Sequence, residues 1–355
     1  MKKKKVAVAM SGGVDSSVAA ALLIEAGYDV LGLTMVNYAL EDRDENLVSA
    51  ARKAADILNI SHEVVDLRSE FEERIIRYFC KEYSRGLTPN PCIRCNREIK
   101  FGLLMEKARE YGAGLFATGH YVRKNFNDQT NRFILNKAKN KAKDQSYFLY
   151  CLTQKQLKHA FFPLGEMDKD KVRQTAVDLG LPAAHKPESQ EICFIPDNDY
   201  VNFLKKNIPG SFKQGPILGP GKKQLGRHKG ILHFTIGQRR GLGIASPHPL
   251  YVLELNARDN AVIVGEDKDL KERFLTASQL NLISLAKIDQ PLSVKARIRY
   301  KHKEADAVIS PLDKNRVRVE FSEPQRAITP GQSVVFYDGD SVVGGAVIEQ
   351  AGRFN

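Results

Sequence analysis

A chain of 355 residues, of which 43% are hydrophobic, is long enough to form two or three domains with ordinary buried cores. No run of about 18 apolar residues occurs, so a membrane-spanning helix is not expected, and five cysteines, an odd number, argue against a disulfide framework. The formal net charge of +12 favours a polyanionic partner, with a merely soluble basic surface as the alternative.

The N-terminal segment has the pattern of a strand, a glycine-rich loop and a helix. Val6 to Met10 is typical of a buried parallel strand, and it is too short for a signal peptide, so we expect a cytoplasmic protein. The turn at Ser11 to Gly13 leads into a helix that Asp15 or Ser16 caps, and residues 28–36 form the next strand. A glycine loop at a helix N-terminus presents backbone N–H groups to a phosphate.

The common phosphate loops do not match this one. The loop G-x-x-x-x-G-K-[ST] needs a lysine that is absent here, and the dinucleotide fingerprint G-x-G-x-x-G is absent too. The sequence S-G-G-x-D-S at Ser11 to Ser16 resembles the pyrophosphate loop of the ATP pyrophosphatases, which cleave ATP to AMP and pyrophosphate. The structural alternative is a plain glycine turn. Adenylation makes a carbonyl oxygen a good leaving group, which a nucleophile must then displace.

The cysteines supply candidate nucleophiles. Cys92 and Cys95 lie in "TPNPCIRCNREIKFG", a spacing that alone leaves a metal site, a redox pair and a nucleophile open. A helix is predicted to start near Cys95, and its dipole with Arg94 and Arg97 would lower the pKa of that thiol. A third candidate, Cys193, lies in "ESQEICFI". The remaining cysteines are interpreted as buried small hydrophobic residues: Cys80 and Cys151.

Six motifs together resemble one family. They are "AMSGGVDSS", "NPCIRCNREIKFG", "ATGHYVR", "KDQSYFL", "ESQEICFI" and "FTIGQRRGLG", and they extend to about residue 245. In order and content they are similar to the tRNA-uridine 2-sulfurtransferases that thiolate the wobble uridine, also called tRNA-specific 2-thiouridylases. The resemblance implies adenylation of the uridine O2 by ATP, followed by sulfur transfer from a cysteine persulfide. The products would be 2-thiouridine, AMP and pyrophosphate.

The resemblance also implies roles for individual residues. The ATP-binding positions would be Ala9, Met10, Ser11, Gly12, Gly13, Val14, Asp15, Ser16, Met35 and Gly119. The tRNA-contacting positions would be Asn90, Pro91, Cys92, His120, Lys143, Asp144, Gln145, Arg299, Tyr300 and Gln332. Cys95 would be the nucleophile and Cys193 the persulfide carrier, and Asp15 is the candidate nearest the phosphates for Mg²⁺. The implied partners are tRNAs of the Lys, Glu and Gln type and a sulfur-relay protein or cysteine desulfurase, with no membrane.

One departure from the family pattern affects the mechanism. Many members have Asp where this chain has Cys92, so three cysteines, Cys92, Cys95 and Cys193, would lie near the site. Three thiolates can hold a [4Fe–4S] cluster and leave one iron open. One alternative is a persulfide relay through Cys95 and Cys193. The other is a structural zinc site, which would usually require a fourth Cys or His ligand. The sequence leaves the three open.

The fold class expected is α/β: a Rossmann-like pyrophosphate-loop domain, a small β domain and a C-terminal β-barrel. Eight of the 20 residues from 207 to 226 are Gly or Pro, which indicates a boundary. The predicted domains are 1–206, which binds ATP, 207–275, and 276–355, which contacts tRNA. In "KARIRYKHK", a strand would place five basic residues from Lys295 to Lys303 on one face, which suits an RNA backbone, with a solvated sheet face as the alternative.

Two rival functions fit parts of this pattern. A related enzyme could adenylate a small molecule, or thiolate another position of tRNA. A non-catalytic RNA-binding protein could hold ATP as a structural ligand, but binding alone needs neither Cys95 nor Cys193.

Overall fold

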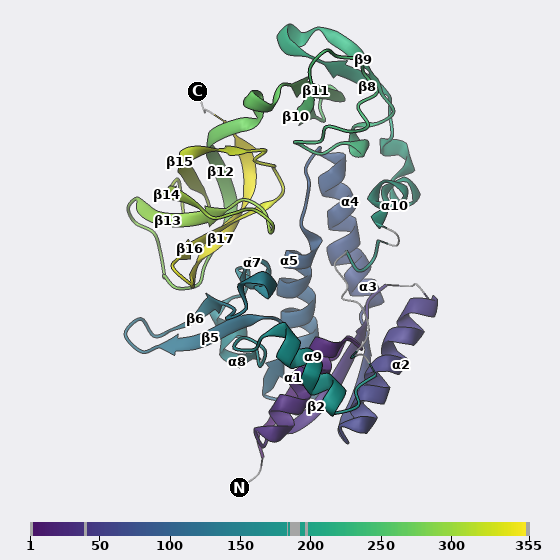
Figure 1. Ribbon diagram of the computed structural model, residues 1–355, viewed down its shortest axis with the longest axis vertical. Helices are drawn as coiled ribbons and strands as arrows, with labels where there is room; N and C mark the ends of the chain where they lie inside the picture. The colour runs from purple at the N-terminus through teal and green to yellow at the C-terminus, as the bar shows by residue number, and fades with distance from the viewer. Residues whose placement is uncertain (1–2, 39–40, 183, 185–191, 196–197, 353–355) are drawn as a thin grey trace.

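Three parts follow one another along the chain. The computed structural model describes residues 3–38, 41–182, 184, 192–195 and 198–352. Figure 1 shows an α/β part near the N-terminus, a small β part at the opposite end, and a β-barrel beside both. The motif residues Ser189 to Glu191 lie outside the described residues. Within the described ranges, no helix is long and apolar enough to cross a membrane.

The α/β part is built on a parallel sheet of five strands in the order β3-β2-β1-β4-β7. The strands are β1 (Lys5–Ala9), β2 (Asp29–Val36), β3 (Ser61–Asp66), β4 (Leu115–Ala117) and β7 (Ala160–Phe161). Val6 and Val8 of β1 enter the core on one face, and Ala7 enters the core on the other. Both faces are therefore covered, which is why β1 is apolar throughout.

Helices cover the two faces of this sheet. On the side of Val6 and Val8 lie α1 (Val14–Glu25), α2 (Glu41–Ile57) and α9 (Lys169–Asp178). On the other side lie two long helical segments, each interrupted by a π-helical stretch. The first consists of α3 (Arg68–Phe71), η1 (Glu72–Ile76) and α4 (Arg77–Ser84), and the second of α5 (Pro91–Cys95), η2 (Asn96–Leu104) and α6 (Met105–Glu110). π-Helical stretches are frequent at functional sites.

Two helix starts differ from the predictions. The helix expected to start near Cys95 begins at Pro91, because Asn90 caps it: Asn90 Oδ1 accepts a hydrogen bond from the Cys92 N–H at 3.2 Å. The first helix has Gly13 as its cap, so Asp15 lies one residue inside the helix instead of capping it.

A segment after β4 connects the α/β part to the barrel. It contains the hairpin β5 (Val122–Asn127) and β6 (Arg132–Lys137), then η3 (Lys141–Lys143), α7 (Ser146–Leu149) and α8 (Gln154–His159). Strand β6 meets the barrel through the pair Asn136 and Ser341. Tyr147 Oη donates to the Ser333 carbonyl of the barrel at 2.8 Å, and both residues are buried. Buried contacts of this kind fix the barrel against the α/β part.

The middle part is a small sheet in the order β10-β11-β8-β9 that follows α10 (Tyr200–Asn207). Its elements are η5 (Pro209–Ser211), β8 (Gly215–Leu218), η6 (Pro220–Lys222), β9 (Gln224–His228), η7 (Ile231–His233), β10 (Tyr251–Asn256), β11 (Ala261–Gly265) and η8 (Asp267–Leu270). It touches the α/β part where a Cβ on Gly86, just after α4, would lie 2.9 Å from the Leu255 carbonyl oxygen.

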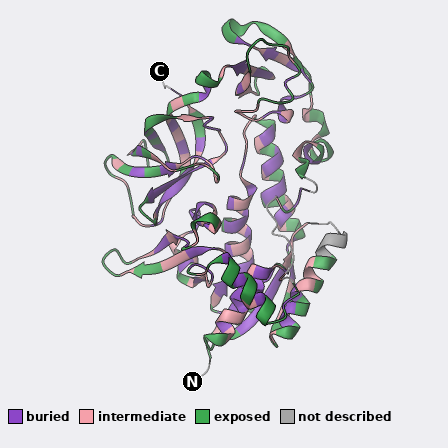
Figure 2. Ribbon diagram, in the orientation of Figure 1, coloured by how far each residue is buried: buried purple, intermediate pink, exposed green. Residues whose placement is uncertain are grey.

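The C-terminal part is a closed barrel. Its strands are β12 (Lys271–Leu282), β13 (Leu292–Arg297), β14 (Ala305–Pro311), β15 (Val317–Arg326), β16 (Ser333–Asp338) and β17 (Ser341–Ala351). Strand β12 pairs with both β15 and β17, which closes the sheet. Figure 2 shows the alternation of buried and exposed residues along these strands. The predicted fold class is therefore confirmed, while the predicted boundary at 275/276 falls inside β12.

The predicted basic strand is wrong in its extent. Strand β13 ends at Arg297, and the chain then turns. The Arg297 side chain is only 15% exposed, with Nη1 3.6 Å from the Asp144 carboxylate. Lys295 pairs with Asp306 at 2.8 Å. Pairing to nearby carboxylates, which the alternating pattern does not reveal, removes these two charges from a continuous basic face.

Candidate active site

The glycine loop between β1 and α1 is held in one shape. Gly12 has a φ of +66°, and a Cβ there would lie 2.8 Å from the Leu47 carbonyl oxygen of α2, so no larger residue fits. Ser16 Oγ donates to the Gly13 carbonyl at 3.0 Å and accepts from the Ser11 N–H at 3.2 Å. No side chain caps α1, so N–H groups of its first turn are available to an anion.

A second loop, which follows β4, packs against the start of α1. A Cβ on Gly119 would lie 2.8 Å from the backbone of Asp15 and Ser16, so glycine allows the two loops to touch. His120 shares a hydrogen bond with Thr118 Oγ1 at 2.8 Å. Burial, and then the positive charge of Lys100, hold the pKa of His120 well below its ordinary value, so the ring is neutral at pH 7. Met35, near the end of β2, is half-buried.

Asp15 is fixed by two residues that sequence reasoning missed. Its Oδ1 accepts from Tyr121 Oη at 2.7 Å and from Lys169 Nζ at 2.6 Å. The Lys169 side chain is only 6% exposed, so a lysine is buried beside the glycine loop. Tyr121 belongs to the motif "ATGHYVR", which could have drawn attention to it, but Lys169 carries no sequence signal.

The three candidate thiols differ in exposure. Cys92 is half-buried, Cys95 is buried and Cys193 is exposed. Asn37, directly after β2, has its Nδ2 3.9 Å from Cys193 Sγ. Cys193 therefore lies at the carboxyl edge of the parallel sheet, where the glycine loop also lies. Cys80 and Cys151 are buried, as predicted, and Cys151 Sγ donates to the Ile93 carbonyl at 3.3 Å.

The predicted low pKa of Cys95 is wrong. Burial raises the pKa of Cys95 to about 12, and the positive charge of Lys100, which lowers this pKa, does not offset the effect of burial. Burial also raises the pKa of Cys92 to about 11, and Cys193 adds to this rise. Arg94 does not help Cys95, because it pairs with Glu98 at 2.9 Å and stacks on the Tyr78 ring at 4.2 Å.

The cysteines are not gathered as a metal centre. Across the described ranges, no group of three His, Cys, Asp or Glu side chains is placed to hold a metal ion. Cys92, Cys95 and Cys193 are all described, so this arrangement does not fit a cluster bound by all three.

The residues expected to contact tRNA divide into two groups. Several lie where the barrel meets the α/β part: Gln332 Nε2 donates to the Thr88 carbonyl at 2.8 Å, and the Tyr300 ring lies 4.5 Å from that of Phe148. Arg299, which precedes Tyr300 in the chain, is half-buried, and Pro91 is buried at the start of α5.

The other group has internal partners. Asp144 is buried and accepts from Ser146 Oγ at 2.8 Å, and Gln145 Oε1 accepts from the Tyr121 N–H at 2.9 Å. Lys143 precedes them at the end of η3. Gln145 thus ties the start of α7 to the residue that holds Asp15.

A parallel sheet with a glycine loop after its first strand defines a nucleotide-binding α/β domain. Comparison with known proteins identifies which one. Residues 4–197 match the tRNA methyl transferase HUP domain, 201–266 the tRNA methyl transferase PRC-barrel domain, and 272–348 the aminomethyltransferase beta-barrel domain.

Full-length relatives agree with these matches. The tRNA-specific 2-thiouridylase MnmA 2 of Thermoanaerobacter sp. (strain X514) is 52% identical over 98% of each chain. MnmA of Acetivibrio thermocellus is 49% identical over 98% of this chain and 100% of that protein. MnmA of Pelotomaculum thermopropionicum is 46% identical over the whole of both chains. The chain therefore belongs to the family of tRNA-specific 2-thiouridylases.

Proposed function

We propose that this protein uses ATP to convert the wobble uridine of tRNA to 2-thiouridine, with release of AMP and pyrophosphate. One observation carries the proposal: Cys193 lies beside Asn37, after β2, at the same sheet edge where the glycine loop follows β1. Ligands of open parallel sheets bind at this edge. A phosphate loop and a sulfur carrier facing one site suit sulfur transfer to an ATP-activated base.

Activation of the base uses the loops around Asp15. The glycine loop from Ala9 to Ser16 holds the phosphates of ATP, and Met35 and Gly119 border the nucleotide. The uridine O2 attacks the α-phosphorus, and pyrophosphate leaves. Lys169 is a positioning residue, since it fixes Asp15 at 2.6 Å and places a positive charge beside the loop. Asp15 would hold Mg²⁺ that arrives with ATP, and the ion would neutralise phosphate charge; one carboxylate suits such an ion.

Sulfur transfer uses Cys193 and Cys95. In one route, the terminal sulfur of the Cys193 persulfide attacks C2 and AMP leaves; the Cys95 thiolate then attacks Cys193 Sγ, and the thiolated base is released. In the other, Cys95 attacks Cys193 Sγ first and releases sulfide, which attacks C2. Both routes oxidise the two cysteines to a disulfide, which a thiol reductant must reduce before the next turnover.

The geometry favours the relay over an iron–sulfur cluster. The relay needs contact between two thiols only, whereas a cluster needs at least three protein ligands, and among the described side chains no group of three is placed to hold a metal ion. We therefore assign Cys92 to the stretch that contacts the target base, together with Asn90 and Pro91.

The tRNA substrate is assigned to the junction of barrel and α/β part. Two contacts support this assignment. Gln332 fixes the barrel beside Thr88 in the loop that precedes Cys92, and Tyr300 packs on Phe148 of α7. His120, Lys143, Asp144, Gln145 and Arg299 complete the proposed set. The expected tRNAs are of the Lys, Glu and Gln type, and a relay protein or cysteine desulfurase supplies the sulfur.

Serine substitutions of single cysteines test the relay. We expect Cys95→Ser and Cys193→Ser to lose 2-thiouridine formation while they still bind tRNA and release pyrophosphate, since activation needs neither thiol. Cys92→Ser is the matched control, which keeps thiolation within about tenfold. The measurements are mass spectrometry of digested tRNA and a pyrophosphate assay. Loss of thiolation in all three variants would instead point to a cluster.

A further inference from the structure

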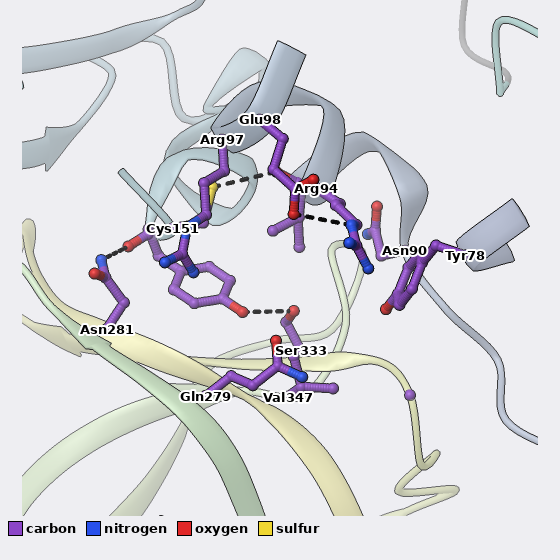
Figure 3. Close-up of a pocket in the computed structure, with 13 residues that line it drawn as sticks. Tyr78, Asn90, Arg94, Arg97, Glu98, Cys151, Gln279, Asn281, Ser333 and Val347 are labelled. Atoms are coloured by element: carbon purple, nitrogen blue, oxygen red, sulfur yellow. Dashed lines mark hydrogen bonds and ion pairs between the residues drawn. The ribbon is translucent and has the colours of Figure 1, made fainter. Parts of the chain in front are cut away.

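A polar pocket lies between the helix that carries the cysteines and the barrel. It has a cavity volume of about 130 Å³. Asn90, Arg94 and Arg97 line it from the start of α5 and from η2, and Gln279, Asn281 and Ser333 line it from barrel strands (Figure 3). None of the roles derived above uses its arginines.

The pocket carries one uncompensated positive charge. Arg94 is compensated, since it pairs with Glu98 at 2.9 Å, and its stacking on Tyr78 holds it rigid. Arg97 forms no ion pair with any residue that the structure describes, and it is exposed. A guanidinium offers two parallel N–H groups, which match the oxygens of a phosphate.

The barrel supplies an amide opposite the arginines. Gln279 has a φ of +55°, a rare backbone conformation for a residue other than glycine, and it lies where the pairing of β12 with β17 shifts register. Bulges of this kind redirect a side chain. The neighbouring Asn281 amide is occupied, because it donates to the Tyr150 and Leu152 carbonyls. The Gln279 amide makes no hydrogen bond to another described residue, so it is available to a ligand.

Asn90 connects this pocket to the proposed reaction site. Its side chain lines the pocket, while its Oδ1 caps the helix at Cys92. Cys95 points into the core from the same helix, whereas Arg94 and Arg97 line the pocket. A group bound in the pocket would therefore lie across one helix from the thiols.

We propose that this pocket binds a phosphodiester of the tRNA backbone close to the target uridine, and that Arg97 and Gln279 donate hydrogen bonds to the phosphate oxygens. This proposal rests on the proposed function. A phosphodiester carries one negative charge, which matches the single uncompensated arginine. An anchored phosphate beside the target would hold the wobble base in place during the two steps of the reaction.

Arg97→Gln and Gln279→Ala test the proposal, with Arg109→Gln as the matched control. Arg109 is exposed near the end of α6, outside the pocket. The tRNA dissociation constant is measured by fluorescence anisotropy across a range of salt concentrations, after thermal melts show that each variant is folded. We expect Arg97→Gln to bind tRNA about tenfold more weakly, and its log–log salt slope to fall by about 0.7, the value for one phosphate contact to a single strand. Gln279→Ala should weaken binding without changing the slope, because it carries no charge.

Two results would overturn the pocket assignment. The first is that Arg97→Gln and Arg109→Gln have the same dissociation constant for tRNA and the same log–log salt slope. The other is unchanged tRNA binding in Arg97→Gln together with lost inhibition by inorganic pyrophosphate, which would show that the pocket holds a free phosphate compound. Failure of the proposed function looks different, because the unsubstituted protein would then form no 2-thiouridine.

Discussion

At the scale of single residues, burial decides the protonation state of Cys95, the proposed nucleophile. The sequence predicts a lowered pKa for Cys95 from the helix dipole and the flanking arginines, but adjacency in sequence does not place a guanidinium near the sulfur. Cys95 faces the core, while Arg94 faces Glu98 and Tyr78. The resting thiol is therefore protonated at neutral pH, and in the proposed relay this protects it from oxidation until it reacts with the Cys193 persulfide.

This burial predicts a pH dependence. Because the pKa of Cys95 is raised to about 12, the thiolate fraction grows about tenfold for each pH unit between pH 7 and pH 9. We expect the single-turnover release of 2-thiouridine, from protein preloaded with persulfide, to rise log-linearly over that range. Pyrophosphate release, which needs no thiolate, is the control. A plateau below pH 8 would show that the thiol ionises easily and that burial is not decisive.

Asp15 illustrates what residue patterns do reveal and what they do not. The motif S-G-G-x-D-S was sufficient to predict the loop, because strand, glycine turn and helix are local. Lys169, the partner of Asp15, lies 154 residues further along the chain. From sequence alone, an isolated lysine in a helix is predicted to be exposed to solvent. An ion pair between residues so far apart in the sequence is visible only once tertiary structure brings the helices together.

At the scale of elements, the loop before Cys92 is shaped by the barrel. The Thr88 N–H donates to the Pro330 carbonyl at 3.0 Å, and Gln332 donates to the Thr88 carbonyl. Gly331 lies between them with a φ of +90°, and a Cβ there would be 2.8 Å from the Thr88 nitrogen. The barrel therefore positions the loop that leads into the cysteine helix.

Two glycine substitutions separate this contact from backbone strain. Gly331→Ala adds both a disfavoured φ and a clash, whereas Gly339→Ala adds only the disfavoured φ of +55°, since nothing lies within 4 Å. We expect Gly339→Ala to lower the free energy of unfolding by about 1 kcal/mol and to leave thiolation unchanged. Gly331→Ala should be less stable still and lose at least about tenfold in thiolation. Equal effects of the two variants in melts and assays would contradict a positioning role for this junction.

Elements were predicted best where their signals are local. The order of strand, loop and helix at the N-terminus, and the strand-rich C-terminal half, follow from apolar periodicity. The apolar pattern that follows Cys95 predicts too late a start for this helix, because the Asn90 cap begins α5 at Pro91. Alternation predicts too long a basic strand, because it does not reveal that Arg297 pairs with Asp144, 153 residues earlier in the chain.

At the scale of the whole molecule, contacts between the barrel and the α/β part connect motifs that are far apart in the sequence. The segment around α7 packs Tyr147 and Tyr150 against Ser333 of the barrel. The same segment holds Tyr121 through Gln145, and Tyr121 holds Asp15. Contacts therefore run from the barrel to the phosphate loop, and the fold class was predictable although this chain of contacts was not.

The proposed relay is tested most directly by supplying iron-free protein with Mg-ATP, a tRNA that has a wobble uridine, a persulfide donor and a thiol reductant. The 2-thiouridine formed is then counted by mass spectrometry. The relay through Cys193 and Cys95 predicts several thiolated bases per protein molecule without iron. If pyrophosphate is released in a tRNA-dependent way but no 2-thiouridine forms until iron and sulfide are restored, the relay is contradicted.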